Sequence, residues 1–182
     1  MTAHGARWMT GESVDEAHEW LLSAIARGGR WPGHLVPPAR MGSDAMTRDL
    51  AALPESVREA REFTRDGLKT WGLAAMFDDV GLVVSELVTN AIRYAVGATS
   101  GPGDTPVRLG LLRTVGRLTC AVADPSDEVP QQGEADFVSQ SGRGLYLVAA
   151  FSDSWNWTPL YGHGKVVWAT FTTRGGEHRG GR

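Results

Sequence analysis

Apolar residues recur at three- and four-residue steps between positions 80 and 95, the spacing of one face of a helix. The apolar positions are Val80, Val84, Leu87, Val88, Ala91 and Ala95. Glu86 and Asn90 stand four residues apart and Arg93 follows three later, so their side chains project from one side of this helix. These three polar residues could form part of a functional site, or they could simply be the solvent-facing side of an amphipathic helix. The helix alone does not decide between these interpretations, so the rest of the chain must.

The pattern before residue 44 predicts an N-terminal extension. Ser13 and Glu16 have capping-box spacing and predict a helix over residues 14–26, with a narrow apolar stripe that includes Trp20, Leu21 and Ile25. Residues 30–43 contain three prolines and two glycines, so we interpret them as a linker. We therefore expect residues 1–43 to be an appendage to a domain spanning residues 44–173, with a disordered tail over 174–182.

Two elements are predicted between the linker and the helix around Glu86. Residues 46–53 form a strand in this prediction, which ends before Pro54. Pro54 then lies in the first turn of an amphipathic helix that runs to Trp71 and stops at Gly72. Asp78 and Asp79 introduce the next helix, because acidic residues are favourable at a helix N-terminus.

The periodicity changes to two after residue 106, which is typical of strands. Apolar residues alternate over 107–111 and again over 118–122, on either side of a turn at 114–116, and predict a β-hairpin. A polar loop over 127–141, a helix over 145–151 and strands over 154–158 and 166–171 complete the order. The sequence therefore predicts an α+β fold, with helices on one face of a mostly antiparallel mixed sheet.

Composition argues against nucleic-acid-binding, disulfide-rich and membrane-spanning proteins. The 182 residues carry a formal charge of −3, which gives no reason to expect direct binding to nucleic acid or to an anionic membrane. The single cysteine, Cys120, excludes an internal disulfide framework. The N-terminal residues have no apolar signal region and no run is long enough to span a membrane, so we expect a soluble cytoplasmic protein.

Three short motifs follow one another on the expected elements. They are Glu86-x-x-x-Asn90 on a helix, Asp124-x-Ser126-x-x-x-Pro130 after a strand, and Gly142-Arg143-Gly144-Leu145 at the start of a helix. Each motif alone is weak evidence. Together, and in this order, they resemble the N, G1 and G2 boxes of the GHKL superfamily of ATP-binding domains, whose Bergerat fold is the two-layer sandwich of the histidine-kinase ATPases.

The resemblance is closest to the small anti-sigma-factor serine kinases, and among these to the actinobacterial regulatory ATP-binding proteins. Their Gly-Lys-x-Val-Trp-Ala motif stands here at residues 164–169, and the resemblance covers residues 46–172. It implies an ATP- and Mg²⁺-dependent serine/threonine-protein kinase that phosphorylates an antagonist protein and binds a sigma factor. The oligomeric state is open between a monomer and a homodimer.

The resemblance also implies roles for individual residues. Asn90 would ligate Mg²⁺, and Glu86 would take the proton from the attacking hydroxyl. Asp124 would accept a hydrogen bond from the amino group of adenine. The nucleotide-binding set is completed by Ser126, Gly142, Gly144, Leu145, Arg93 and Arg143. Arg93 could equally pair with Glu86, and Arg143 could equally point to solvent.

Ser126 departs from the Asp-x-Gly form of the wider superfamily, and residues 131–141 are a short substitute for its ATP lid. Two alternatives remain beside the kinase. His18-Glu19 resembles the phospho-accepting pair of histidine kinases, but only one short helix precedes the linker, whereas that class needs two long ones. A non-catalytic, nucleotide-dependent binding module for a transcriptional regulator is the stronger alternative, since Glu86 indicates competence for transfer and not a substrate.

Overall fold

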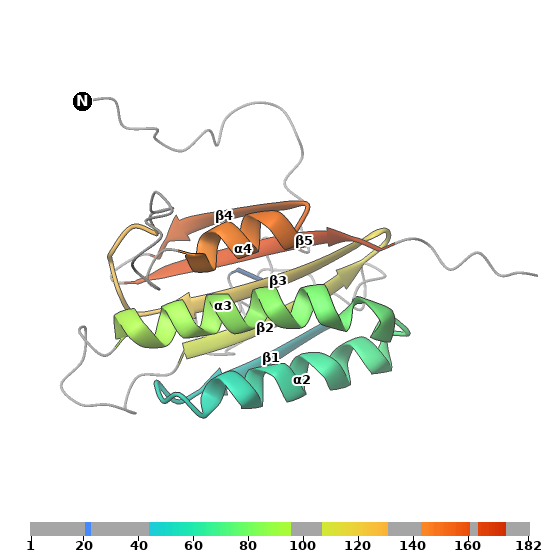
Figure 1. Ribbon diagram of the computed structural model, residues 1–182, viewed down its shortest axis with the longest axis horizontal. Coiled ribbons are helices and arrows are strands. Elements are labelled where there is room, and N and C mark those ends of the chain that lie inside the picture. Colours follow the sequence, from blue (N-terminus) through green and yellow to red (C-terminus); the bar gives the residue numbers. More distant parts are fainter. Residues whose placement is uncertain (1–20, 23–43, 96–106, 131–142, 161–163, 174–182) are drawn as a thin grey trace, which may run out of the picture.

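Five strands form a single sheet in the order β1-β2-β3-β5-β4, and each neighbouring pair is antiparallel (Figure 1). The computed structural model describes residues 21–22, 44–95, 107–130, 143–160 and 164–173. The strands are β1 (Asp44–Leu50), β2 (Val107–Thr114), β3 (Arg117–Asp124), β4 (Ser154–Pro159) and β5 (Lys165–Thr172). The predicted linker and C-terminal tail, and the predicted N-terminal helix apart from residues 21–22, lie outside the described residues.

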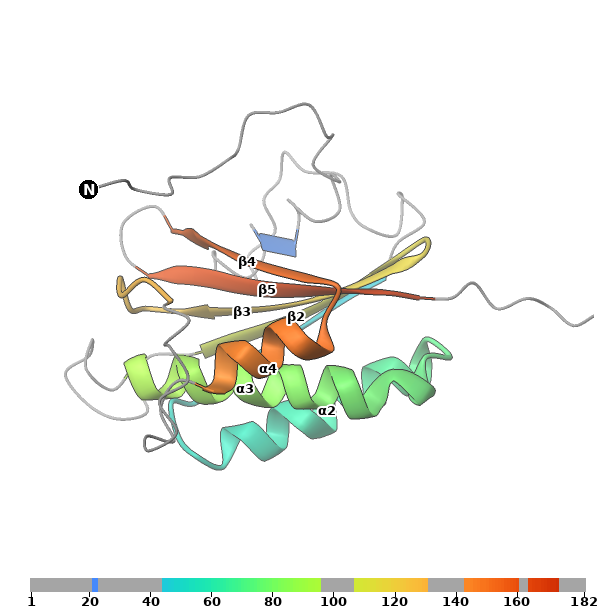
Figure 2. The same cartoon turned by 45° about the horizontal axis from the view of Figure 1, so that its top comes forward.

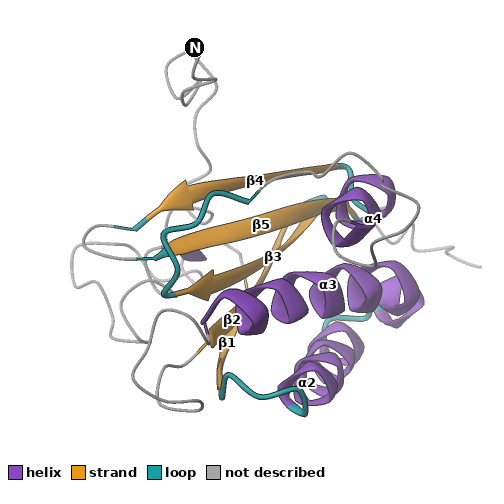
Figure 3. Ribbon diagram, turned by 60° about the vertical axis from the view of Figure 1, so that its left-hand side comes forward, coloured by secondary structure: helices purple, strands orange, loops and turns teal. Residues whose placement is uncertain are grey.

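The helices that follow β1 lie together on one face of this sheet (Figure 2). They are α2 (Ser56–Thr70), the short 3-10 helix η2 (Ala74–Met76), α3 (Phe77–Ala95) and α4 (Arg143–Phe151). Helix α3 lies between α2 and α4 (Figure 3). The α+β class, the mostly antiparallel sheet and the single helical face predicted from the sequence are confirmed.

The main core fills the space between α3 and the sheet. All six positions of the apolar stripe on α3 are buried, none more than 3% exposed. The same core contains the alternating apolar positions from which the β2–β3 hairpin was predicted, among them Leu109, Leu111, Leu118, Cys120 and Val122. Because α3 is held along its full apolar side, its polar side is fixed in orientation relative to the strands.

Element boundaries differ from the prediction near Pro54. Strand β1 begins at Asp44 and ends at Leu50 instead of spanning 46–53, and α2 begins at Ser56. Pro54 lies in a turn ahead of the helix, where the amide of Ser56 donates to the carbonyl of Leu53. Gly72 has a φ of 71°, a left-handed conformation that favours glycine and ends this segment as predicted.

A second, smaller core lies on the opposite face of the sheet. Leu112, Ala121, Ala123 and Val166 alternate with the residues of the main core, so they point away from the helices. Leu21 packs against them and is 0% exposed. The two described residues of the predicted N-terminal helix therefore contact the domain, although the domain boundary itself stays a prediction.

Leu21→Ala is expected to lower the free energy of unfolding by about 2 kcal/mol, because it removes buried methyl groups from a cluster whose small neighbours cannot fill the space. Urea denaturation measures the change. Leu22→Ala is the matched control, since Leu22 is only half-buried and should lose less stability. Equal stability of Leu21→Ala and the wild-type protein would contradict this packing.

Candidate functional site

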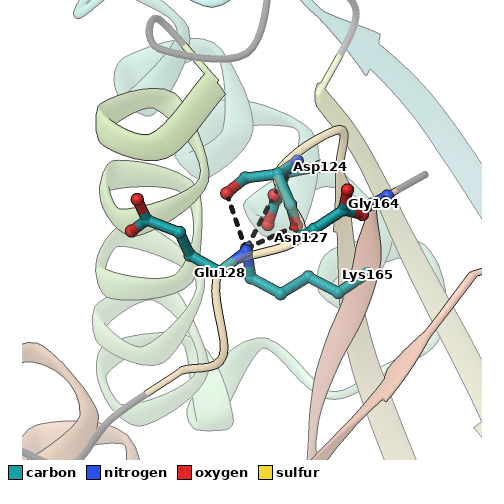
Figure 4. Close-up of polar contacts among 6 residues, drawn as sticks. Asp124, Asp127, Glu128, Gly164 and Lys165 are labelled. Carbon is teal, nitrogen blue, oxygen red and sulfur yellow. Dashed lines mark hydrogen bonds and ion pairs between the residues drawn. The ribbon is translucent and has the colours of Figure 1, made fainter.

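Asp124 and Lys165 form a buried ion pair where β3 ends and β5 begins (Figure 4). The two residues are partners in the antiparallel register of these strands. Lys165 Nζ lies 2.9 Å from Asp124 Oδ1, and the side chains are only 4% and 3% exposed. The proposed adenine acceptor is therefore already in contact with a cation from another strand.

Ser126 closes a tight local structure around this pair. Its amide donates to Asp124 Oδ1 at 2.9 Å, and its carbonyl accepts from Lys165 Nζ at 3.0 Å. Its hydroxyl accepts from the amide of Glu128 at 3.2 Å. A side chain that bonds the backbone two residues on is the usual behaviour of aspartate and serine in turns. Serine thus shapes the chain where the wider superfamily has glycine.

Gly164 lets the neighbouring chain approach this turn. Its amide donates to Asp127 Oδ1 at 2.7 Å, and its φ is 91°. A Cβ at this position would lie 2.3 Å from the backbone oxygen of Asp124. Only glycine fits here without displacing the backbone that carries Asp124.

Burial and the ion pair with Lys165 shift the pKa of the Asp124 carboxyl in opposite directions. Removal from water raises the pKa of the Asp124 carboxyl, and the hydrogen bond and charge of Lys165 lower it, with a net upward shift. Burial is the larger effect because desolvation disfavours the charged form. Lys165 therefore offsets part of the cost that burial imposes on the charged form of Asp124.

Glu86 and Asn90 lie against the start of α4. A Cβ on Gly144 would lie 2.9 Å from Glu86 Oε2 and 3.2 Å from Asn90 Nδ2. The absence of a side chain on Gly144 thus lets the first turn of α4 approach the polar side of α3. The first amide groups of a helix have no partners within it, so they suit an anion such as phosphate.

Glu86 is half-buried, and burial raises the pKa of its carboxyl. The positive charge of Arg93 lowers the pKa in part. From the sequence, Arg93 could either pair with Glu86 or approach the phosphates. In the structure its charge is close enough to lower the pKa of Glu86. Whether Arg93 also contacts phosphate stays a prediction.

If Glu86 is the proton acceptor that the motif resemblance implies, Arg93→Gln should move the low-pH limit of the expected phosphoryl transfer upward. A carboxylate base works when ionised, so its rate falls as pH falls through its pKa. Without the Arg93 charge, the pKa of Glu86 rises further and this fall begins at higher pH. A pH profile of phosphate transfer from radiolabelled ATP tests this, with the exposed Arg58→Gln as control. An unchanged profile in Arg93→Gln would contradict the coupling.

The two parts of the site meet at the C-terminal end of α3. Lys165 Nζ lies 5.4 Å from the centre of the Tyr94 ring, and Tyr94 follows Asn90 by one helical turn. Of the other predicted site residues, Arg143 is exposed and Leu145 packs in the main core. Gly142 lies outside the described residues. The sequence did not assign a role to Lys165, although a lysine opening an apolar strand was a usable signal.

The donor set suits a hard divalent cation. Asn90 supplies an amide oxygen beside the Glu86 carboxylate, and Mg²⁺ prefers few protein oxygens together with waters and substrate phosphates. Among the described residues, no three or more His, Cys, Asp or Glu side chains gather into a metal-binding group. Asn90, near the start of α4, stays the predicted ligand that would hold Mg²⁺ bound with a triphosphate.

A family profile described as a histidine kinase-like ATPase domain matches residues 50–171. The chain belongs to this family. The matched region contains every predicted site residue, from Glu86 to Leu145, together with Lys165. It leaves out only the part of β1 before Leu50 and the last residue of β5 among the helices and strands from β1 onward. The family resemblance predicted from the sequence motifs is confirmed.

The chain is also similar to individual proteins. It is 32% identical over 88 residues to the serine-protein kinase RsbW of Bacillus licheniformis, covering 42% of this chain and 53% of that protein. The chain thus spans about half the length of this curated relative.

Two crystal structures share the fold at low identity. One contains the RsbU and RsbW domains of a Mycobacterium tuberculosis protein, with a TM-score of 0.54 and 17% identity over 71% of this chain and 32% of that one. The other is the SiaB–SiaC complex of Pseudomonas aeruginosa, with a TM-score of 0.56 and 13% identity over 73% of this chain and 92% of that one.

Within the described residues, none of the helices is long and apolar enough to cross a membrane.

Proposed function

We propose that this protein is a regulatory kinase that binds ATP with Mg²⁺ and phosphorylates a serine or threonine of an antagonist protein. The observation that carries the proposal is the approach of the α4 start to Glu86 and Asn90, which Gly144 makes possible. In this proposal, Glu86 is the acceptor for a proton, Asn90 the ligand for a cation, and the amides at the start of α4 the donors for phosphate. Phosphoryl transfer depends mainly on such positioning and charge neutralisation.

Each side chain then has a defined task. Glu86 accepts the proton of the attacking hydroxyl, and Asn90 holds Mg²⁺, which neutralises charge on the phosphates when bound. Asp124 accepts a hydrogen bond from the amino group of adenine, with Ser126 fixing the carboxylate in place. Arg143, exposed at the start of α4, adds positive charge near the phosphates.

The proposed partners are a sigma factor, bound in one state of the switch, and the antagonist that is phosphorylated. The similarity to a protein named as a serine-protein kinase supports the kinase assignment. These partners would place the protein in the cytoplasm. A partner docked across the site could close it over ATP and present its own hydroxyl.

A radiolabelled ATP assay tests the proposal with each candidate antagonist encoded in the same cell. The expected result is label on one serine or threonine of an antagonist, with release of a bound regulator. Turnover by the protein alone should be far below the roughly 1–100 s⁻¹ of dedicated kinases. Fast hydrolysis without any labelled protein would favour an ATPase. Tight ATP binding with neither labelling nor hydrolysis would favour a non-catalytic binding module.

Asp124→Asn should weaken ATP binding by about 1–3 kcal/mol, because it removes a charged hydrogen-bond acceptor while keeping the shape of the side chain. Isothermal titration calorimetry with ATP and GTP measures the loss. Asp49→Asn is the control, since Asp49 pairs with Arg108 at the exposed edge strand β1. Equal affinity for ATP and GTP in the wild-type protein would overturn the role of Asp124.

A further inference from the structure

Lys165 is an unusual residue to find buried. Lysine and aspartate are almost never fully buried unless they are paired. A buried ion pair contributes little net stability, because the loss of hydration offsets the attraction, and well-packed apolar residues often serve as well. Stability therefore does not explain why Lys165 lies beside the one carboxylate proposed to recognise the base.

The hydrogen bonds of Asp124 and Lys165 leave one acceptor and one donor of the pair without a partner among the described residues. Asp124 Oδ1 accepts from both Lys165 Nζ and the amide of Ser126. Lys165 Nζ donates to Oδ1 and to the carbonyl of Ser126. Within the described residues, these bonds use one of the two carboxylate oxygens and two of the three ammonium protons. These bonds therefore leave an acceptor, Asp124 Oδ2, and a donor, the third N–H of Lys165, on two side chains that are already in contact.

Adenine carries the complementary pattern. Its amino group is a donor, and the ring nitrogens on either side of that group are acceptors. Guanine has an acceptor oxygen where adenine has the amino group, so it would face the carboxylate with like polarity. A guanine shifted sideways could satisfy the pair, but phosphates held at the start of α4 oppose such a shift.

We propose that Lys165 is a specificity-determining residue that donates to the adenine ring nitrogen next to the amino group accepted by Asp124. The inference rests on the proposed binding of ATP and adds a second group that reads the base. The surroundings strengthen the contact, because a hydrogen bond shielded from water is stronger and an unmatched polar group there is more costly. The Tyr94 ring also lies near the ammonium, with its centre 5.4 Å from Nζ.

The experiment compares ATP with 1-deaza-ATP and 7-deaza-ATP, each of which lacks one of the two ring nitrogens beside the amino group. Affinities are measured for the wild-type protein, Lys165→Met and Arg113→Met. Arg113→Met is the matched control because it removes a cation ion-paired to Asp44 at the opposite end of the β2–β3 hairpin. Thermal melting checks that each variant is folded.

One of the two deaza nucleotides should bind the wild-type protein and Arg113→Met about tenfold more weakly than ATP, the usual effect of losing a charged hydrogen bond. In Lys165→Met, removal of the same ring nitrogen should change the affinity by less than about twofold. The preference of this variant for ATP over GTP should also fall. If Lys165→Met does not fold, Lys165→Gln replaces it. Its shorter side chain cannot reach both Asp124 and the base, and the same result is expected.

Two results would overturn the inference. Full affinity of the wild-type protein for both deaza nucleotides would show that no ring nitrogen is read. An equal loss in wild-type protein and Lys165 variant would show that another group reads it. Failure of the proposed function gives a different result, since the wild-type protein would then not bind ATP itself.

Discussion

Glu86→Gln should lower the rate of phosphoryl transfer by about 10²–10⁴-fold, the usual contribution of a general base. Glutamine keeps the size of the side chain but cannot accept the proton of the attacking hydroxyl. The affinity for ATP should change little, because Asp124, Asn90 and the amides at the start of α4 are proposed to hold the nucleotide. The rate is measured by label transfer to the antagonist, and the affinity by calorimetry.

Two variants make this result interpretable. Asn90→Ala should lose Mg²⁺-dependent nucleotide binding, because it removes the proposed metal ligand next to Glu86. Glu62→Gln, which changes an exposed carboxylate paired with Arg58 on α2, should behave like the wild-type protein. If Glu86→Gln lost nucleotide as completely as Asn90→Ala, the role of Glu86 would be structural and not catalytic.

The elements of the site could be predicted from the sequence because they combine local periodicity with chemically specific motifs. The stripe on α3 has a period that only a helix satisfies, and its six positions are all buried. The same stripe fixes where Glu86 and Asn90 project. Gly144 was predicted to lie at a helix start, and its close approach to both residues explains why a side chain is excluded there.

The contacts between distant segments could not be predicted in this way. Asp124 and Lys165 are 41 residues apart, and their contact depends on the register between β3 and β5, which are separated by a helix and a strand. Nothing in the local pattern gives that register. Leu21 is a similar case, since its stripe indicates a buried side but not the sheet face that buries it.

Asp124→Ala should lower the free energy of unfolding by about 3–5 kcal/mol, the effect expected when one partner of a buried ion pair is removed. The reason is that the Lys165 ammonium, only 4% exposed, would remain buried without its counter-charge. The carbonyl of Ser126 would still accept one hydrogen bond from it but cannot neutralise it. Urea denaturation measures the loss.

The double variant Asp124→Ala/Lys165→Met separates the pair from the site around it. Because it removes the stranded charge and keeps an apolar side chain of similar length, most of the lost stability should return, although nucleotide binding should not. Asp44→Ala is the control, since its pair with Arg113 is partly exposed and a solvated cation tolerates the loss. If Asp124→Ala were as stable as the wild-type protein, Lys165 would have reached solvent, and the buried pair would not hold the end of β3 to the start of β5.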